Sequence, residues 1–175
     1  MVTITISGTP GSGKSTVAQL VGKKLGLHYV YSGELFRKMA HDHHMSLEEF
    51  GKYCEMHRGI DEQLDAHQLE LLQKGNVVLE GRIAGWIAHR NKIPAVKVLL
   101  HADIKTRSQR VVNREQGDVA TRRQEIVERE RSEMTRYKKY YNIDLMDTSI
   151  YDLVIDSSDK TPEAIVAVIL EAIDQ

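Results

Sequence analysis

An α/β fold built on one parallel sheet is predicted by three features of this chain. Short segments rich in β-branched residues alternate with longer segments whose apolar residues recur at helical spacing. A glycine-rich loop separates the first strand from the first helix, and polar residues directly follow the later strands. Strands separated by helices form a parallel sheet with helices on both faces, a three-layer α/β/α arrangement. Ligands of such sheets lie beyond the carboxyl ends of the strands, so functional residues are expected there.

Composition and charge limit the class of protein. The 175 residues are 41% hydrophobic and 28% charged, which suits one globular domain over residues 1–175. No apolar run approaches the roughly 18 residues of a membrane span, and no basic segment followed by an apolar one opens the chain. A cytoplasmic monomer without a membrane partner is therefore expected. The net charge of −1 argues against a nucleic-acid partner, and the single cysteine, Cys54, receives no role.

The first strand, VTITIS, leads into the segment GTPGSGKST, which fits the motif G-x-x-x-x-G-K-[ST]. Glycines let backbone N–H groups surround phosphate oxygens, and the N-terminus of the next helix adds a favourable dipole. Lys14 is expected to bridge the β- and γ-phosphates, and the Ser15 hydroxyl to ligate Mg²⁺. The motif predicts a site for a nucleoside triphosphate formed by Gly8, Thr9, Pro10, Gly11, Ser12, Gly13, Lys14, Ser15 and Thr16.

The segments after this loop continue the alternation. A helix from Ser15 ends before Gly26, and LHYVYS forms a second strand ending at Ser32 and Gly33. A helix opens with GELFRKMA, and a second one starts at the capping-box pair Ser46 and Glu49. The third helix of this group has one face formed by Ile60, Leu64, Gln68 and Leu71.

Three more strands complete the predicted sheet. They are NVVLEGR, AVKVLL and YDLVIDSS, in chain order. Asp103 is a suitable cap for the helix after the fourth strand. Thr161 and Pro162 form a cap and first-turn pair for a final apolar helix.

The strand ends carry a second set of candidate residues. Ser32, Glu80 and Arg82 fall at the carboxyl edge of the sheet, and Arg37 lies one helical turn beyond Ser32. Guanidinium groups suit a phosphate dianion because they bind it in a bidentate way, so Arg37 and Arg82 are expected to hold the phosphate of an acceptor. Glu80 ends a strand next to the loop and is expected to reach Mg²⁺ through its water shell.

An arginine-rich segment covers residues 107–136. Eight arginines and six acids occur there, and the break at EQGDV predicts two helices joined by a short turn. Much of this charge is typical of a salt-bridged helical surface. The hairpin is also suited to close over a nucleotide as a lid, which would exclude water from phosphoryl transfer. Spacing alone does not say which arginines point inward.

Two further features receive no catalytic role. The histidines of HDHH, residues 41–44, are adjacent on a helix end and lack a suitably spaced partner ligand, so they are interpreted as solvated. Trp86 is interpreted as a core residue, although its place just past Arg82 leaves contact with a base open.

Six segments together resemble the compact type 2 cytidylate kinases, which are members of the nucleoside monophosphate kinase family: GTPGSGKST, YSGELFRKMA, SLEEFGKYCE, VVLEGRIAGW, ERERSEMTRYKKYYNIDL and SIYDLVIDSS. The similarity covers essentially the whole chain. Many families share the first segment, so the specific part is SGE-F-R, EGR-AGW and YDLVI in register.

This resemblance implies transfer of the γ-phosphate of ATP to CMP or dCMP. It implies a P-loop NTPase fold with strand order 2-3-1-4-5, an acceptor-binding helical segment near residues 35–72 and an arginine-bearing lid. Ser32, Arg37 and Arg82 match the acceptor-nucleotide positions. Arg129 and Arg136 match the lid arginines best, with Arg131 a further match.

One departure from the family concerns the base. The longer cytidylate kinases have an aspartate directly after the glycine-arginine pair and a larger acceptor-binding insert, whereas this chain has Ile83 and no such insert. Cytosine must be recognised differently, and the candidates are Asp61, Asp65 and Arg58. Solvated helix ends and caps are the alternative reading of these three residues.

The expected mechanism is a direct in-line transfer. An acceptor phosphate with a second pKa of about 6 is already mostly a dianion at neutral pH and needs no general base. Alternatives remain at this point: a kinase for AMP, UMP or a non-nucleotide acceptor such as shikimate, a P-loop switch or nucleic-acid-stimulated ATPase, and a nucleotide-binding regulator without turnover.

Overall fold

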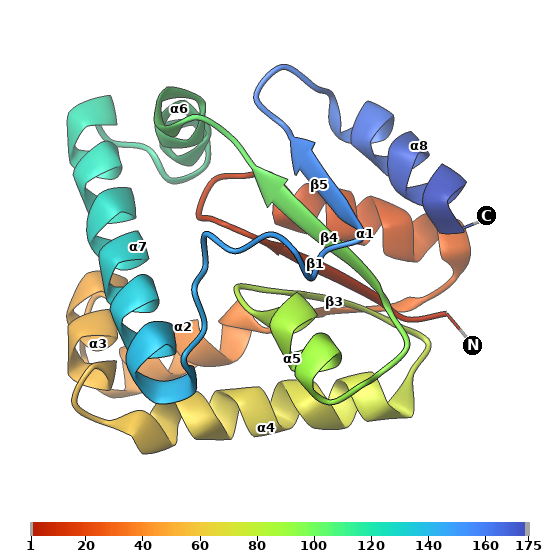
Figure 1. Ribbon diagram of the computed structural model, residues 1–175. Coiled ribbons are helices and arrows are strands. Elements are labelled where there is room, and N and C mark those ends of the chain that lie inside the picture. The colour runs from red at the N-terminus through yellow and green to blue at the C-terminus, as the bar shows by residue number, and fades with distance from the viewer. Residues whose placement is uncertain (1, 174–175) are drawn as a thin grey trace.

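A computed structural model describes residues 2–173 and places five parallel strands in the order β2-β3-β1-β4-β5 (Figure 1). The ends of the expected 1–175 domain, Met1 and residues 174–175, lie outside the described residues. The strands are β1 (Ile4–Gly8), β2 (His28–Tyr31), β3 (Val77–Gly81), β4 (Val96–His101) and β5 (Leu153–Asp156). The predicted α/β class and the strand order implied by the resemblance are therefore confirmed.

The residues of the central strands alternate between two hydrophobic cores, one on each face of the sheet. Val78 of β3 packs in the core with α1 (Lys14–Leu25) and α8 (Pro162–Ile173), and Ile4 and Ile6 of β1 lie in the same core. Val77 and Leu79 of β3 point to the other face. This alternation follows from the period of two of a β-strand. The two cores, with the helices that pack in them, give the three layers that the sequence predicts. Strand β1 lies at the centre of the sheet, between β3 and β4.

The second core contains a helix that the sequence did not predict. This helix, α5 (Ala84–Arg90), follows β3 directly and is buried from Ala84 to Ala88. Its seven residues are too few to show a helical period. Trp86 is 8% exposed in this core, so its interpretation as a core residue is confirmed.

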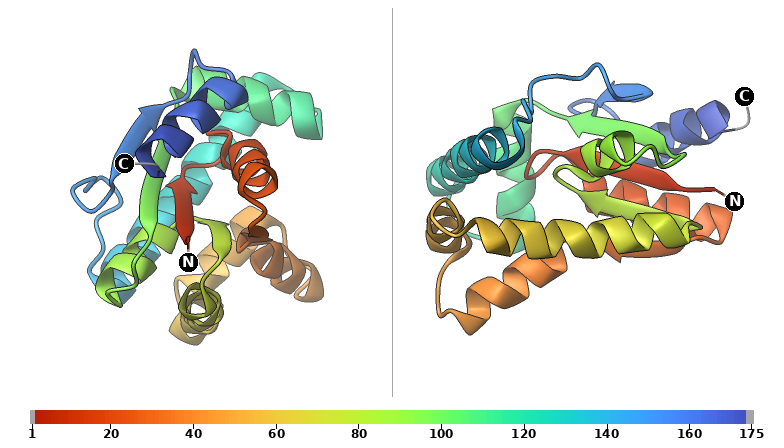
Figure 2. Two further views of the ribbon diagram at one scale, coloured as in Figure 1. Left: turned by 90° about the vertical axis from the view of Figure 1, so that its right-hand side faces the viewer. Right: turned by 60° about the horizontal axis from the view of Figure 1, so that its bottom comes forward.

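Three helices follow β2 in the chain, and the last of them also packs in the second core through Leu72. They are α2 (Gly33–Asp42), α3 (Leu47–Cys54) and α4 (Arg58–Lys74), and their small core includes Phe50 and Cys54. The predicted capping box is confirmed: the backbone N–H of Glu49 donates to Ser46 Oγ at 3.1 Å, and the Ser46 N–H donates to Glu49 Oε2 at 2.8 Å. Figure 2 shows α4 running along the sheet, while α3 lies at its carboxyl side.

The predicted arginine-rich hairpin is also confirmed. It consists of α6 (Ile104–Glu115) and α7 (Val119–Tyr141), which lie beyond the carboxyl ends of the strands in Figures 1 and 2. Asp103 and Asp118 cap the two helices by accepting from the N–H groups of Thr106 and Thr121. The turn between them uses Gln116 and Gly117, both with positive φ. The second helix continues past the expected end at residue 136.

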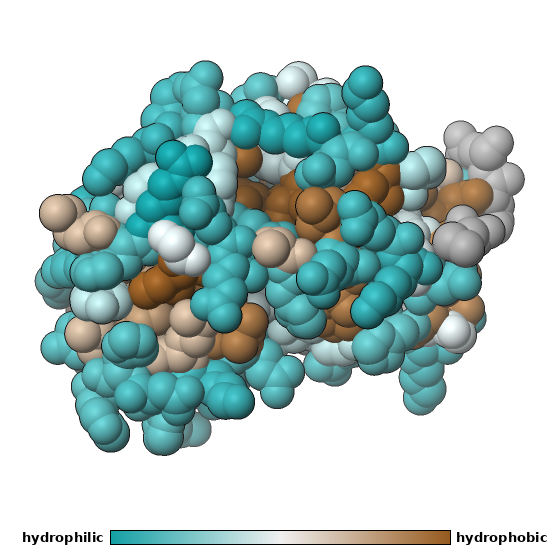
Figure 3. All heavy atoms as spheres, turned by 90° about the horizontal axis from the view of Figure 1, so that it is seen from below, coloured by the Kyte–Doolittle hydropathy of each residue, from teal (hydrophilic) through white to brown (hydrophobic). Residues whose placement is uncertain are grey.

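Within residues 2–173, no helix has both the length and the apolar character needed to cross a bilayer. The face seen from below is mainly hydrophilic, with separate hydrophobic areas between polar side chains (Figure 3).

Candidate active site

The loop of residues 8–16 connects the end of β1 to α1. A Cβ at Gly8 would collide with the backbone carbonyl of Leu100 on the neighbouring strand β4, so only glycine fits there. Gly13 has a φ of +91° and is the N-cap of α1, which brings the free N–H groups of the helix N-terminus into the loop. The local backbone is therefore that of an anion-binding loop.

Lys14 lies buried against this loop, and its Nζ donates to the carbonyl of Thr9 at 2.8 Å. Burial, followed by the cationic neighbour Arg82, lowers the pKa of Lys14 well below its usual value. Two loop hydroxyls, Thr9 Oγ1 and Ser12 Oγ, are buried without a hydrogen-bond partner among residues 2–173. The buried Lys14 ammonium and the two unpartnered hydroxyls fit a site for an anion, which would balance the charge of Lys14 and accept hydrogen bonds from the hydroxyls.

Ser15 and Glu80 lie side by side at the ends of the loop and of β3. Ser15 Oγ donates to Glu80 Oε1 at 2.9 Å, and the Tyr29 hydroxyl donates to Glu80 Oε2 at 2.6 Å. Hydroxyl and carboxylate oxygens are the ligands that Mg²⁺ prefers, so this donor set fits the predicted metal. The histidines 41–44 are exposed at the end of α2, away from this pair.

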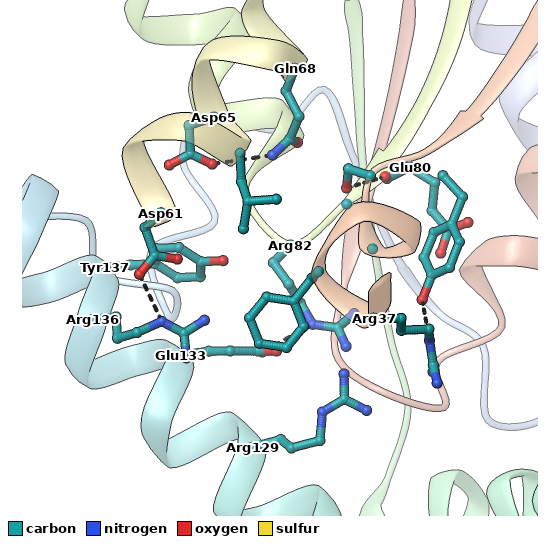
Figure 4. A pocket seen from close by; sticks show the side chains of 16 residues that line it. Arg37, Asp61, Asp65, Gln68, Glu80, Arg82, Arg129, Glu133, Arg136 and Tyr137 are labelled. Atoms are coloured by element: carbon teal, nitrogen blue, oxygen red, sulfur yellow. Dashed lines mark hydrogen bonds and ion pairs between the residues drawn. The ribbon is translucent and has the colours of Figure 1, made fainter. Parts of the chain in front are cut away.

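A second pocket lies beyond β2 and β3, between α2, α4 and α7 (Figure 4). The expected acceptor residues Ser32, Arg37 and Arg82 all line it. Ser32 is fixed to the end of β3, because its hydroxyl donates to the Glu80 carbonyl at 2.6 Å. Arg37 Nε donates to the Tyr31 hydroxyl at 3.2 Å. The structure thus brings together residues that the sequence places 50 positions apart.

Arg82 joins the two parts of the site. Its Nε donates to both carboxylate oxygens of Glu133 at 2.9 and 3.0 Å, and its Nη1 donates to the Gly8 carbonyl at 3.1 Å. Burial acts to lower the pKa of Arg82, but the Glu133 carboxylate outweighs it and raises that pKa. Arg82 is therefore charged and held between the phosphate loop and the lid helix α7.

Arg129 lies on the lid side of the same pocket. Burial and then the charge of Arg82 lower its pKa, and no hydrogen-bond or ion-pair partner of Arg129 occurs among residues 2–173. Arg37, Arg82 and Arg129 therefore lie at the same side of the pocket, where Glu133 bonds Arg82 and Glu115 lies 3.9 Å from Arg37 (Figure 4). These guanidinium groups suit a phosphate dianion.

Arg136, the other expected lid arginine, lies at the opposite end of the pocket. Its Nε donates to Asp61 Oδ2 at 3.0 Å, and its Nη1 donates to Ser132 Oγ at 2.9 Å. Both members of the Arg136 and Asp61 pair are nearly fully buried. Arg136 therefore contacts α4 and does not lie over the phosphate loop.

Arg58, a candidate for recognition of the base, and Arg131, a candidate lid arginine, do not line this pocket. Arg58 is exposed and donates to Glu62 at 2.6 Å, while Arg131 donates to Glu55 at 3.3 Å on the outer side of α7. Asp65 does line the pocket.

Sequence reasoning missed Glu133 and Gln68 as site residues. A signal for Gln68 existed, because it is a polar residue on the buried face of its helix.

A separate hollow of about 470 Å³ opens on the other side of the loop. Arg110 and Ser157 line it, and Arg110 donates to the hydroxyl and the carbonyl of Ser157 at 3.0 and 2.6 Å. Arg107 of the same helix donates to the carbonyl of Pro10 at 3.3 Å and to Glu130 at 2.8 Å. The first helix of the hairpin, α6, is thus bonded to the loop and, through Arg107 and Glu130, to α7.

Comparison with known proteins identifies the family. A parallel sheet in this order, with a phosphate loop after its central strand, defines the P-loop class of domains. Residues 3–159 match the model of the cytidylate kinase-like family, and the chain belongs to this family. The family expected from the resemblance is confirmed.

Individual relatives agree with this result. The chain is 45% identical over 172 residues to the cytidylate kinase of Methanocaldococcus jannaschii, covering 98% of this chain and 97% of that protein. It is 44% identical to the cytidylate kinase of Pyrococcus horikoshii, covering 98% of this chain and 88% of that protein.

Solved structures share the fold. A protein from Eubacterium ventriosum aligns with a TM-score of 0.74 at 19% identity, covering 100% of this chain and 99% of that chain. A shikimate kinase from Bacteroides thetaiotaomicron aligns with a TM-score of 0.62 at 15% identity, covering 99% of each chain.

Asp65 generates a prediction about stability and pH. Burial raises the pKa of Asp65 to about 7, so between its usual value near 4 and pH 7 the folded state holds a proton that the unfolded state has lost. The contribution of Asp65 to the free energy of unfolding must therefore fall as the pH rises through this window. Asp65→Asn cannot ionise, so its stability relative to wild type should increase from pH 5 to pH 8 in urea unfolding. Asp144→Asn, at an exposed position, is the control; equal slopes for wild type and Asp65→Asn would contradict the prediction.

Proposed function

We propose that this protein transfers the γ-phosphate of ATP to CMP or dCMP, giving ADP and CDP or dCDP. The observation that carries the proposal is the position of Arg82, which bonds the phosphate loop and lines a pocket with three further arginines. A triphosphate on the loop and a monophosphate among the arginines would then meet at this side chain. Family membership supports a kinase, and the names of its relatives support CMP as the acceptor.

The loop residues Gly8 to Thr16 hold the donor phosphates in this proposal. Their N–H groups and Lys14 bind the β- and γ-phosphates, and the hollow beside Arg110 and Ser157 receives the rest of the donor nucleotide. Ser15 and Glu80 would hold Mg²⁺, which supplies neutralisation of charge on the β- and γ-phosphate oxygens when bound.

The arginines position the acceptor. Arg37 and Arg82 bind its phosphate, and Arg129 reaches the transferring group from the lid. Because the acceptor phosphate is largely a dianion at neutral pH, its oxygen attacks in line without a general base. Developing charge in the transition state is stabilised by Lys14 and the arginines, which are already oriented by their own contacts.

Arg136 acts at the acceptor side and not on the transferring group. Its bond to Asp61 joins α7 to α4, whereas its bond to Ser132 lies within α7, so Asp61 contributes to substrate binding through its pair with Arg136. The single domain, the monomeric state, the cytoplasmic location and the lack of nucleic-acid or membrane partners stay predictions.

The proposal is tested by measuring ADP production from Mg-ATP with one acceptor at a time. CMP and dCMP should support fast turnover, whereas UMP, AMP, GMP and shikimate should not. Shikimate belongs in this set because shikimate kinases share the fold. Preference for a different acceptor would contradict the assignment of CMP and dCMP as substrates. ATP hydrolysis that does not depend on any acceptor would favour the alternatives of a switch or a regulator.

Lys14→Ala should lower kcat by about 10²-fold or more, because the variant loses the cation that stabilises charge on the transferring phosphate. Steady-state rates with ATP and CMP measure the effect. Lys23→Ala changes an exposed lysine of the same helix and should leave kcat unchanged. A near-normal rate in Lys14→Ala would remove this residue from the mechanism.

Arg82→Ala should also lower kcat by about 10²-fold or more and should raise the KM for CMP, because Arg82 both positions the acceptor and contacts the loop. Arg131→Ala, on the outer side of the lid helix, is the matched control and should behave like wild type. Circular dichroism and thermal melting separate a misfolded variant from an inactive one. A folded Arg82→Ala variant with normal kinetics would contradict the assignment.

A further inference from the structure

Two oxygen atoms at the α4 end of the acceptor pocket lack hydrogen-bond partners. They are Gln68 Oε1 and Asp65 Oδ2, and both are buried without a donor among residues 2–173. The Gln68 side chain is 94% buried, since 6% of the residue is exposed. Both residues line the pocket and lie on α4, three residues apart. Buried acceptors are usually satisfied, so this pair requires an explanation.

The orientation of these side chains is fixed by a bond between them. Gln68 Nε2 donates to Asp65 Oδ1 at 3.2 Å, which directs the carbonyl of the Gln68 amide away from Asp65. A Cβ at Gly81, the last residue of β3, would come within 3.0 Å of Gln68 Oε1. Gln68 therefore lies next to the strand end that carries Arg82, and glycine at position 81 leaves room for it.

The two ends of the pocket differ in chemistry. Arg37, Arg82 and Arg129 gather at one end, while Asp65 and Gln68 lie at the other (Figure 4). An acceptor nucleotide whose phosphate binds the arginines would direct its base toward α4. Asp61 lies there too, but its carboxylate is bonded to Arg136.

We propose that Gln68, held in orientation by Asp65, reads the 4-amino edge of the acceptor's pyrimidine ring and so selects cytosine over uracil. This inference rests on the proposed function and names its specificity residues. The exocyclic amino group of cytosine offers N–H donors, whereas uracil has a carbonyl oxygen at the same position. Gln68 Oε1 accepts from the amino group of cytosine, and a uracil carbonyl would face the same oxygen without a proton between them.

Asp65 positions the amide of Gln68. Its Oδ1 accepts from Gln68 Nε2 at 3.2 Å, which leaves the Gln68 carbonyl, and not its N–H groups, directed to the base. Burial raises the pKa of Asp65, while the Tyr141 hydroxyl and the charge of Arg136 act to lower it. Uracil presents an oxygen at position 4, which lacks the N–H that the Gln68 carbonyl requires.

The test compares kcat/KM for CMP and UMP in wild type and two variants. Asp65→Asn places a carboxamide at this position, whose N–H can donate to Gln68 Oε1 and so allow the Gln68 amide to turn its own N–H toward the uracil oxygen. The ratio of kcat/KM for CMP to that for UMP should fall by about tenfold, within the range for one good contact to a base. The change should include an absolute gain with UMP.

Gln68→Met removes the amide with little change in volume. Its KM for CMP should rise about tenfold with kcat less affected, because the base is bound before and during transfer. A CMP analogue with hydrogen in place of the 4-amino group should be a poor substrate for wild type and should lose little further in Gln68→Met. Gln63→Met, an exposed glutamine of the same helix, is the matched control.

The outcomes separate this inference from the proposed function. If wild type prefers an acceptor other than a cytidine nucleotide, the proposed function fails. If wild type prefers CMP but folded variants lose activity with CMP and UMP equally, the two residues are merely structural and the inference is overturned. The KM for ATP and the melting temperature monitor folding. If Gln68→Met does not fold, the ratio of kcat/KM for CMP to that for UMP in Asp65→Asn decides whether the inference holds.

Discussion

The ion pair between Arg82 and Glu133 is the interaction on which the site depends. Arg82 directly follows β3, Glu133 lies on α7, and a further bond from Arg82 reaches the Gly8 carbonyl at the start of the phosphate loop. Three separate parts of the chain are thus joined at one guanidinium. Because the two side chains are only 19% and 10% exposed, removing one partner would leave a largely desolvated charge without its partner, which costs more than an exposed ion pair contributes.

Two further cations lie close to this pair. Lys14 and Arg129 are both desolvated beside Arg82, and the pKa of each is lowered from its usual value by burial and by that neighbour. Like charges held together in a pocket favour any ligand that brings anionic oxygens to them. Donor and acceptor phosphates would supply such oxygens on either side of Arg82, so charge on the substrates offsets repulsion within the protein.

Helical periodicity explains which lid residues face inward. Arg129, Glu133 and Arg136 follow one another at spacings of four and three and therefore share one face of α7, whereas Arg131 lies on the other side. The sequence predicted the phosphate loop, the strands and the hairpin because their signals are local. It did not predict Glu133, because the role of this residue depends on Arg82, which lies 51 positions away in the sequence. Gln68 was also missed, although its place on the buried face of α4 was a local signal. The seven-residue α5 carried no period to detect.

A second buried pair sets the width of the acceptor pocket. Arg136 lies one turn beyond Glu133 on α7 and bonds Asp61 on α4, with a further contact to Ser132. Such a pair adds little stability relative to apolar residues, because desolvation of both charges opposes their attraction. Its directional bonds instead fix α4 against α7. The α4 face that carries Gln68 is thereby held opposite Arg82, and two ion pairs on one helix determine both ends of the pocket.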